Sequence, residues 1–238
     1  GNLKGCRKIF DYFGHRVREF ITFDGSVDVV VQEAVGSHRY RIEINTEGGH
    51  SYANFGNRNA IAYLASLINT LYNIKVPNRG KTTYNVGTIS GGTKENIIAD
   101  SVTMTGTIRA LTPEIQAHLK DSVRRIAEHT ARAWGGDVEL VMDDLCPALI
   151  NDEALTSRIF AQAQALLGPE RTVMMKEPSL GADDFAFFSS HSPGCYFNVG
   201  ARTEGLPGQA LHSPSFVPHE DSLETALLLL TGSVLSLL

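Results

Sequence analysis

The sequence has little cysteine, no excess of positive charge and no long uninterrupted apolar run. Its 238 residues include three cysteines, 21 Lys and Arg against 26 Asp and Glu, and a formal net charge of -5 at pH 7. Cys6, Cys146 and Cys195 form no C-x-x-C pair, so neither a disulfide framework nor a cysteine-held zinc site is expected. This cysteine usage favours a reducing, cytoplasmic setting.

The charge balance and the termini also exclude some classes of partner. A negative net charge with only short basic clusters, such as "RVR" and "VRR", predicts no nucleic-acid or anionic-membrane surface. The C-terminal run "ALLLLTGSVLSLL" is too short and interrupted to span a bilayer, so we predict a buried helix there. The start, "GNLKGCRKIF", lacks a signal-peptide core. Because it has no Met and no preceding strand, we expect the chain to be a fragment without its N-terminal part.

What the sequence does contain is a regular change of periodicity between residues 38 and 143. "RYRIEIN" alternates as a strand does, and the following helical stripe comprises Ala60, Ile61, Leu64, Leu67, Ile68 and Leu71. Two further strands, "TTYNVGTIS" and "SVTMTGTIRAL", precede a helix capped at Thr112 and a last strand, "DVELVM". The order strand-helix-strand-strand-helix-strand is that of a split, ferredoxin-like sandwich.

Other α/β segments flank this unit on both sides, so the predicted fold class is α/β with an inserted domain. We assign residues 37–146 to the inserted domain, and residues 1–36 and 147–238 to the domain that receives it. The flanking segments alternate between strands such as "FITFDG" and "CYFNVG" and helices such as residues 152–167. Such alternation predicts a mixed or parallel sheet covered by helices.

The stretch "NTEGGHSYANFG" presents His50 behind two glycines. Paired glycines allow a sharp turn at the end of a strand, so the next side chain can be held outward toward a ligand. An ordinary loop has the same composition, and this alternative stays open at the level of the stretch alone.

Two more residues are candidate metal ligands. Asp24 follows the apolar strand "FITF", where α/β sheets collect their sites, and it could be a metal ligand or a base. An Asp-Gly turn is the ordinary alternative. His212, in "ALHSPSF", is either a ligand or a surface-loop histidine.

Polar groups at strand ends and turns are further candidates. Asn96, in "GGTKEN", could offer its amide to an oxyanion, although Asn often only satisfies turn backbone. Arg109 ends a strand, where its planar fork could bind a substrate carboxylate or remain a solvated charge. Asp183 and Asp184, in "GADDFAFF", are either a helix-capping pair or a catalytic dyad.

Several stretches taken together carry a resemblance that extends over nearly the whole chain, in order. They are "GGHSYANFGNRNAI", "GTISGGTKENIIADSVTMTGTIR", "SLGADDFAFF", "PGCYFNVG" and "LHSPSF". The chain resembles the two-zinc aminoacylase and carboxypeptidase family, which includes glutamate carboxypeptidase, tripeptide aminopeptidase, allantoate amidohydrolase and the hippurate or N-acyl amino acid hydrolases. The resemblance implies a catalytic domain that holds two zinc ions, with an inserted lid or dimerisation domain of the split order.

The resemblance also implies roles for single residues. His50 is similar to the lid histidine that reaches the partner subunit's active site and stabilises the oxyanion. Asn96 and Arg109 are similar to the lid residues that bind the substrate's carbonyl or carboxylate. His212 matches the last zinc ligand and Asp24 the carboxylate ligand of the other zinc. A homodimer formed through residues 37–146 and a small peptide or N-acyl amino acid substrate are therefore expected.

One departure from the family is large. The H-x-D segment, the bridging Asp and the Glu-Glu pair that carries the general base are not in this sequence. Asp24 and His212 alone cannot hold a dinuclear zinc centre, so we expect the chain as given to be inactive. The peptidase and amidohydrolase branches both remain open, as does a rival function: a non-catalytic dimerisation or scaffold module derived from the family.

Overall fold

The computed structural model describes residues 3–26, 29–30, 33–76, 81–179, 181–200 and 213–238. Two compact units divide the chain: residues 35–147 form one, and residues 3–34 together with 148–238 form the other. Each unit has a hydrophobic core of its own. The boundaries predicted after residues 36 and 146 differ from the observed ones by two residues and one residue.

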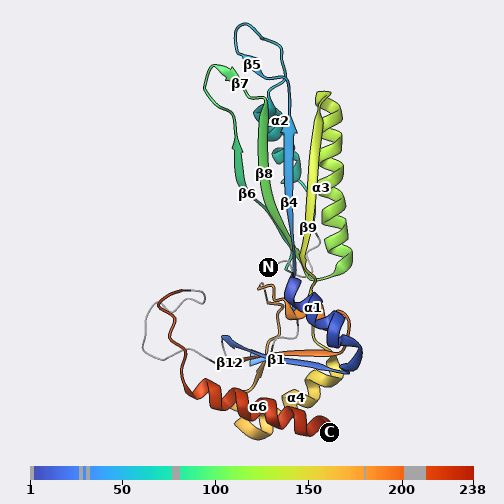
Figure 1. Ribbon diagram of the computed structural model, residues 1–238, viewed down its shortest axis with the longest axis vertical. Coiled ribbons are helices and arrows are strands. Elements are labelled where there is room, and N and C mark those ends of the chain that lie inside the picture. Colours follow the sequence, from blue (N-terminus) through green and yellow to red (C-terminus); the bar gives the residue numbers. More distant parts are fainter. Residues whose placement is uncertain (1–2, 27–28, 31–32, 77–80, 180, 201–212) are drawn as a thin grey trace. The chain divides into compact units, whose positions relative to one another are not determined.

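The unit of residues 35–147 is a four-stranded antiparallel sheet with two helices on one face (Figure 1). The strand order is β6-β8-β4-β9, and β5 and β7 pair as a separate two-stranded sheet. This arrangement confirms the split βαββαβ order predicted from periodicity. The elements are β4 (Gly36–Asn45), β5 (Gly49–His50), α2 (Ala60–Leu71), β6 (Thr83–Gly91), β7 (Ile97–Ile98), β8 (Ser101–Ala110), α3 (Pro113–Trp134) and β9 (Asp137–Cys146).

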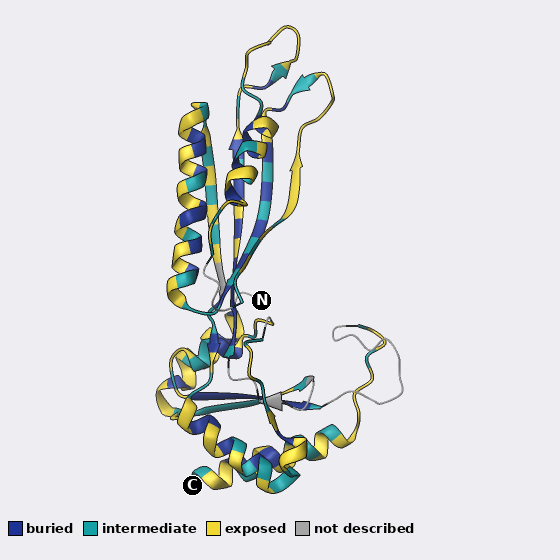
Figure 2. Cartoon of the chain, turned by 180° about the vertical axis from the view of Figure 1, so that it is seen from behind, coloured by how far each residue is buried: buried dark blue, intermediate teal, exposed yellow. Residues whose placement is uncertain are grey.

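Alternation along the central strands decides which sheet face is buried. Tyr40, Ile42 and Ile44 on β4 are at most 2% exposed and pack under the helices. The residues between them, Arg41 and Glu43, lie on the other face, as successive strand side chains must. Figure 2 shows the same alternation, with buried residues between mostly exposed ones along β4 and between mostly half-buried ones along β8. The core therefore lies between the sheet and the α2–α3 layer.

The helix ends follow the local sequence. Asn59 caps α2 by accepting hydrogen bonds from the backbone of Ile61 and Ala62, at 2.9 and 3.4 Å. Thr112 caps α3, its hydroxyl accepting from the Ile115 N–H at 3.3 Å, and Pro113 occupies the first turn. Gly135 ends α3 with φ 65°, as a left-handed C-terminal glycine does. The predicted start of this helix at Thr112 is confirmed.

The prediction that Ile61 lies on the buried face of α2 is wrong. Ile61 is 47% exposed, whereas Tyr63 is 1% exposed and belongs to the core. The Tyr63 ring stacks on Trp134 with ring centres 5.8 Å apart, and its hydroxyl donates to the Ala127 carbonyl at 3.5 Å. The aromatic ring fills the space at the end of α3, so the buried stripe of α2 is rotated away from Ile61.

The other unit contains a mixed four-stranded sheet of order β1-β12-β2-β11. β1 is parallel to β12, β12 is antiparallel to β2, and β2 is parallel to β11, which confirms the predicted mixed sheet. The elements are α1 (Lys4–Phe13), the 3-10 turn Gly14–Arg16, β1 (Phe20–Ser26), β2 (Val29–Val30), β3 (Glu33–Ala34), β10 (Leu149–Ile150), α4 (Glu153–Leu167), the 3-10 turn Pro169–Arg171, β11 (Val173–Met174), α5 (Phe185–Ser189), β12 (Gly194–Gly200) and α6 (Asp221–Leu237).

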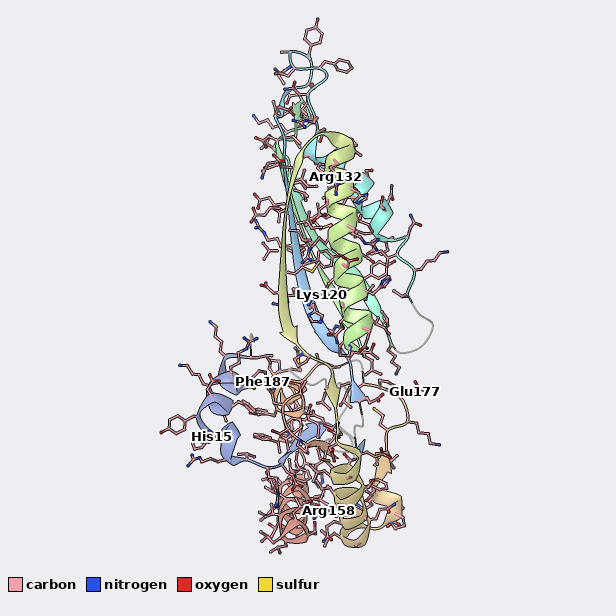
Figure 3. All side chains as sticks on the ribbon, turned by 90° about the vertical axis from the view of Figure 1, so that its right-hand side faces the viewer. His15, Lys120, Arg132, Arg158, Glu177 and Phe187 are labelled. Carbon is pink, nitrogen blue, oxygen red and sulfur yellow. The ribbon has the colours of Figure 1, made fainter. Side chains whose placement is uncertain are left out.

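Helices α4 and α6 cover one face of this sheet. Cys195, Phe197 and Val199 of β12 are at most 4% exposed and form a core with buried residues of α4 and with Leu229 of α6. The opposite face carries α1 and α5, whose rings form an aromatic cluster with Phe20 of β1. Figure 3 labels Phe187 of α5 in this cluster. The two faces of β12 therefore have different neighbours.

The sequence prediction of a buried C-terminal helix is wrong. On α6 only Leu229 and Ser233 are buried, while Leu223 and Leu227 are 74% and 66% exposed. The helix contacts its unit along one side only, so an apolar composition all round does not bury all of its residues. No helix in the described residues is long and apolar enough to cross a membrane.

A close approach within the larger sheet gives a test of the packing. A Cβ added at Gly106 of β8 would overlap the Tyr40 ring and the backbone carbonyl oxygen of Asn85. We expect Gly106→Ala to lower the free energy of unfolding by about 1 to 3 kcal/mol, because neither neighbour can move cheaply. Gly87→Ala on β6 is the matched control, since its nearest atom would be 3.8 Å away. Thermal unfolding measures both, and equal losses would contradict the packing described.

Candidate active site

His50 is held at a tip of the 35–147 unit by the two glycines before it. Gly48 and Gly49 have φ angles of 59° and 120°, which residues with side chains rarely adopt. A Cβ would also lie 2.6 Å from the Asp100 side chain at Gly48, and 2.7 Å from the Asn54 side chain at Gly49. The glycines therefore allow the backbone to pass close to its neighbours, and His50 emerges exposed at the end of β5.

The His50 ring is oriented by the backbone that follows it. The Tyr52 N–H donates to His50 Nδ1 at 3.3 Å. An N–H donor needs a lone pair on Nδ1, so the neutral ring carries its proton on Nε2. Asn54 fixes the same turn, because its side-chain oxygen accepts from the His50 N–H at 3.0 Å. The exposed edge of the imidazole is therefore a hydrogen-bond donor.

Asn96 lies beside this turn. The backbone carbonyl of Asn96 accepts a hydrogen bond from the Ser51 N–H at 3.0 Å. In the adjoining strands, His50 of β5 is the register partner of Ile97 in β7. The segment that sequence reasoning treated only as a turn thus contains a strand, and that strand joins Asn96 to the His50 turn.

Arg109 lies at the other end of the same sheet. It is the ninth residue of β8 and pairs with Ser37 of β4 and Thr83 of β6. β5 and β7 lie beyond the end of the sheet where β8 begins (Figure 1). Eight residue steps separate Ser101 from Arg109, or about 27 Å of extended strand. One chain therefore does not bring Arg109 together with Asn96 and His50.

In the other unit, Asp24 is part of strand β1. It pairs in register with Asn198 of β12, and β1 continues to Ser26, so the alternative of an Asp-Gly turn is wrong. One carboxylate oxygen accepts from the Gly25 N–H at 2.7 Å, and the other accepts from the Tyr196 hydroxyl at 2.7 Å. Burial and this hydrogen bond raise the pKa of Tyr196 above its usual range, so the hydroxyl remains a donor.

Asp183 and Asp184 have different surroundings. The Asp183 carboxylate accepts from the Phe185 N–H at 2.8 Å, whereas Asp184 makes no side-chain cap for α5. Burial raises the pKa of Asp183, and the nearby charges of Asp184 and Asp24 raise it further. Burial and a hydrogen bond with Asp184 raise the pKa of the Cys6 thiol to about 11. Asp183, not a pair of aspartates, is the helix cap, and it lies close enough to Asp24 to interact with its charge.

The second predicted metal ligand, His212, lies outside the described residues. Within the part of the chain that the structure describes, no three His, Cys, Asp or Glu residues are grouped closely enough to hold a metal ion. Sequence reasoning missed Tyr196 and Asn198. The alternation in "CYFNVG" could have found them, because it places both on the strand face opposite Cys195, Phe197 and Val199.

Known proteins include a matching family model and relatives of similar sequence. Residues 33–135 match the family described as peptidase dimerisation domain, M20_dimer. The chain is 32% identical over 197 residues to thermostable carboxypeptidase 2 of Saccharolobus solfataricus, covering 79% of this chain and 48% of the relative. It is 29% identical over 201 residues to N-acetyldiaminopimelate deacetylase of Pediococcus pentosaceus, covering 81% and 50%. The chain thus spans about half the length of the curated relatives it matches.

A solved structure shares the fold. The crystal structure described as a dinuclear metal-binding peptidase of the M20 family, from Bacillus subtilis, superposes with a TM-score of 0.75 and 22% identity. The superposition covers all of this chain and 62% of that one. Residues 33–135 are similar to a peptidase dimerisation domain. The chain is homologous to a carboxypeptidase and a deacetylase, which confirms the resemblance inferred from its motifs.

The hydrogen bonds predict opposite tautomers for two histidines. His50 Nδ1 accepts from an N–H, so we expect its neutral ring to be protonated at Nε2. His191 Nδ1 lies 2.7 Å from the Phe187 carbonyl, which can only accept, so its ring should be protonated at Nδ1. Nitrogen NMR of the imidazole rings above their titration range measures both. The same tautomer for both rings would contradict the His50 geometry.

Proposed function

We propose that this chain is part of a zinc-dependent exopeptidase or amidohydrolase that cleaves an amide or peptide bond next to a free carboxylate. The relatives named as a carboxypeptidase and a deacetylase support amide-bond hydrolysis. The match to a peptidase dimerisation domain supports a homodimer formed through residues 37–146. The cytoplasmic setting stays a prediction that rests on the number and spacing of the cysteines.

The observation that carries this proposal is the joint placement of His50 and Asn96 at one tip. Both side chains can donate hydrogen bonds, His50 through Nε2 and Asn96 through its amide. Two donors on segments joined by a backbone hydrogen bond suit a tetrahedral oxyanion, whose charge develops as the carbonyl is attacked. The His50 side chain is exposed on its turn, so the oxyanion that it would stabilise must approach from outside this tip.

The length of the sheet decides how such a site must be built. Arg109 lies at the far end of β8 from the His50 tip, about 27 Å away along the strand. A small substrate cannot touch both ends of one domain. We assign Arg109 to the substrate carboxylate, which its planar fork can bind with two hydrogen bonds. His50 and Asn96 would then act on the substrate held by the partner subunit.

The two edge strands of the sheet differ in how well they could pair with a second copy. β9 carries Asp137, Glu139 and Asp143, and like charges on an edge oppose pairing with another strand. β6, Thr83–Gly91, has no charged residue and no proline. Exposed Ile89 on β6 and exposed Ile61 on α2 add apolar surface. We therefore assign the dimer contact to the β6 edge.

A divalent metal belongs to this proposal, and zinc is the ion we expect. Bound zinc would polarise the substrate carbonyl and activate water. Asp24 would supply one carboxylate ligand, and its setting beside a second acid, Asp183, fits a cation. His212 stays a proposed ligand from the sequence. The rival function, a non-catalytic dimerisation module, differs in that the complete protein would hydrolyse no amide substrate.

The composite site can be tested by mixing inactive variants of the complete protein. His50→Ala and Arg109→Ala should each lower kcat/KM by about 30-fold or more on an N-acyl amino acid. When the two are mixed and subunits exchange, half of the dimers are hybrids with one intact site. Activity should then return to about a quarter of the wild-type value, because each hybrid combines one good tip with the other subunit's Arg109.

The matched control mixes His50→Ala with Asn96→Ala. Both residues belong to the same tip, so every site in the hybrid lacks one of them and activity should not return. Recovery in both mixtures, or in neither, would contradict the assignment of the tip and Arg109 to different subunits. No amide hydrolysis by the complete wild-type protein would favour the non-catalytic module.

The dimer edge gives a separate prediction. Ile89→Glu places a charge on the neutral β6 edge and should convert the dimer to monomers, as measured by sedimentation. Val141→Glu is the control, because Val141 is similarly exposed, at 41% against 56% for Ile89, but lies on β9. Dissociation by Val141→Glu alone would assign the contact to the opposite edge.

A further inference from the structure

In the unit of residues 3–34 and 148–238, the sheet β1-β12-β2-β11 has one face whose residues the proposed function does not fully explain. Tyr196 and Asn198 alternate with Cys195, Phe197 and Val199 along β12, so they lie on the face away from α4 and α6. In the parallel pairing, Thr22 opposes Tyr196 and Asp24 opposes Asn198. Register partners on adjacent strands, about 4.8 Å apart, direct their side chains to the same side. Asp24, Tyr196 and Asn198 therefore share one surface.

Tyr196 holds the Asp24 carboxylate in a defined orientation. Its ring is 9% exposed and lies 6.1 Å from the Phe185 ring, so the hydroxyl has little freedom to move. That hydroxyl donates to one Asp24 oxygen at 2.7 Å, while the Gly25 N–H donates to the other. Each oxygen keeps further lone pairs, since a carboxylate accepts about four hydrogen bonds or metal contacts. Hydrogen bonds of this kind orient metal ligands in proteins.

Asn198 presents an oxygen without a partner. The side chain is 8% exposed, and its Oδ1 has no hydrogen-bond partner in the part of the chain that the structure describes. Buried polar atoms almost always have partners, and an exception needs an explanation such as an ion or a ligand. Removing the oxygen from water without a partner destabilises the fold. A cation beside Asp24 would supply the missing interaction.

We propose that Tyr196 and Asn198 belong to the divalent-metal site of Asp24: Tyr196 is a positioning residue that orients the carboxylate, and Asn198 Oδ1 is a neutral oxygen donor toward the cation. The inference rests on the proposed function, because it needs Asp24 to bind a metal. It goes further by naming two residues of β12 that sequence reasoning did not assign. Carboxylate oxygens are among the ligands that zinc accepts, so this surface is compatible with the zinc expected for the proposed function.

Metal affinity, rather than turnover, tests the inference. The complete protein is stripped of metal with a chelator, and Zn²⁺ is titrated in competition with a chromophoric chelator. Tyr196→Phe should weaken Zn²⁺ binding about tenfold or more, as loss of such supporting hydrogen bonds does. Asn198→Leu should also weaken Zn²⁺ binding, yet the metal-free protein should melt no lower than wild type, because an unpartnered oxygen has been removed. Asn198→Asp should bind Zn²⁺ at least as tightly as wild type.

Two controls separate a metal role from a structural one. Tyr63→Phe removes a buried hydroxyl in the other unit, and Ser233→Ala removes another buried oxygen without a described partner, on α6. Neither should change Zn²⁺ affinity. If Asp24→Ala weakens Zn²⁺ binding while Tyr196→Phe and Asn198→Leu do not, the inference is wrong and the proposed metal role of Asp24 survives. If Asp24→Ala has no effect either, both fail.

Discussion

The alternation of side chains across a β-strand is the constraint on which both units depend. A strand directs successive residues to opposite faces, so a strand that buries one face against helices leaves the other face for different chemistry. In the larger sheet this places Ile42 in the core and Arg41 outside. In the smaller sheet it places Phe197 against α4 and α6, and Tyr196 and Asn198 beside Asp24. Packing on one face thus determines which polar groups meet on the other.

In the sheet β1-β12-β2-β11, the surroundings stabilise the residues of the polar face less well than those of the apolar face. Asn198 Oδ1 has no described partner, and burial together with two neighbouring carboxylates disfavours the charged form of Asp183. Both features destabilise an isolated fold, and both are relieved when positive charge is nearby. The apolar face, with Cys195 and Val199 fully covered, provides the packing that holds these polar groups in place.

The long antiparallel sheet has a similar consequence at a larger scale. Its ten-residue strands separate the His50 turn from Arg109 by most of the domain length. A rigid sheet does not fold back on itself, so residues at its two ends cannot serve one small substrate within one chain. The uncharged β6 edge and the acidic β9 edge add an asymmetry that favours one way of pairing two such domains.

Local patterns in the sequence determined the split βαββαβ order, the caps of α3 and the glycine-supported turn at His50, because each depends on residues close together along the chain. Tertiary packing decided the rest. Ile61 lost its core position because Tyr63 stacks on Trp134, and the leucines of α6 stayed exposed because that helix packs along one side. The Tyr196–Asp24 contact joins residues 172 positions apart, and no local periodicity encodes such a distance. Only the pairing of β1 with β12 brings the two together.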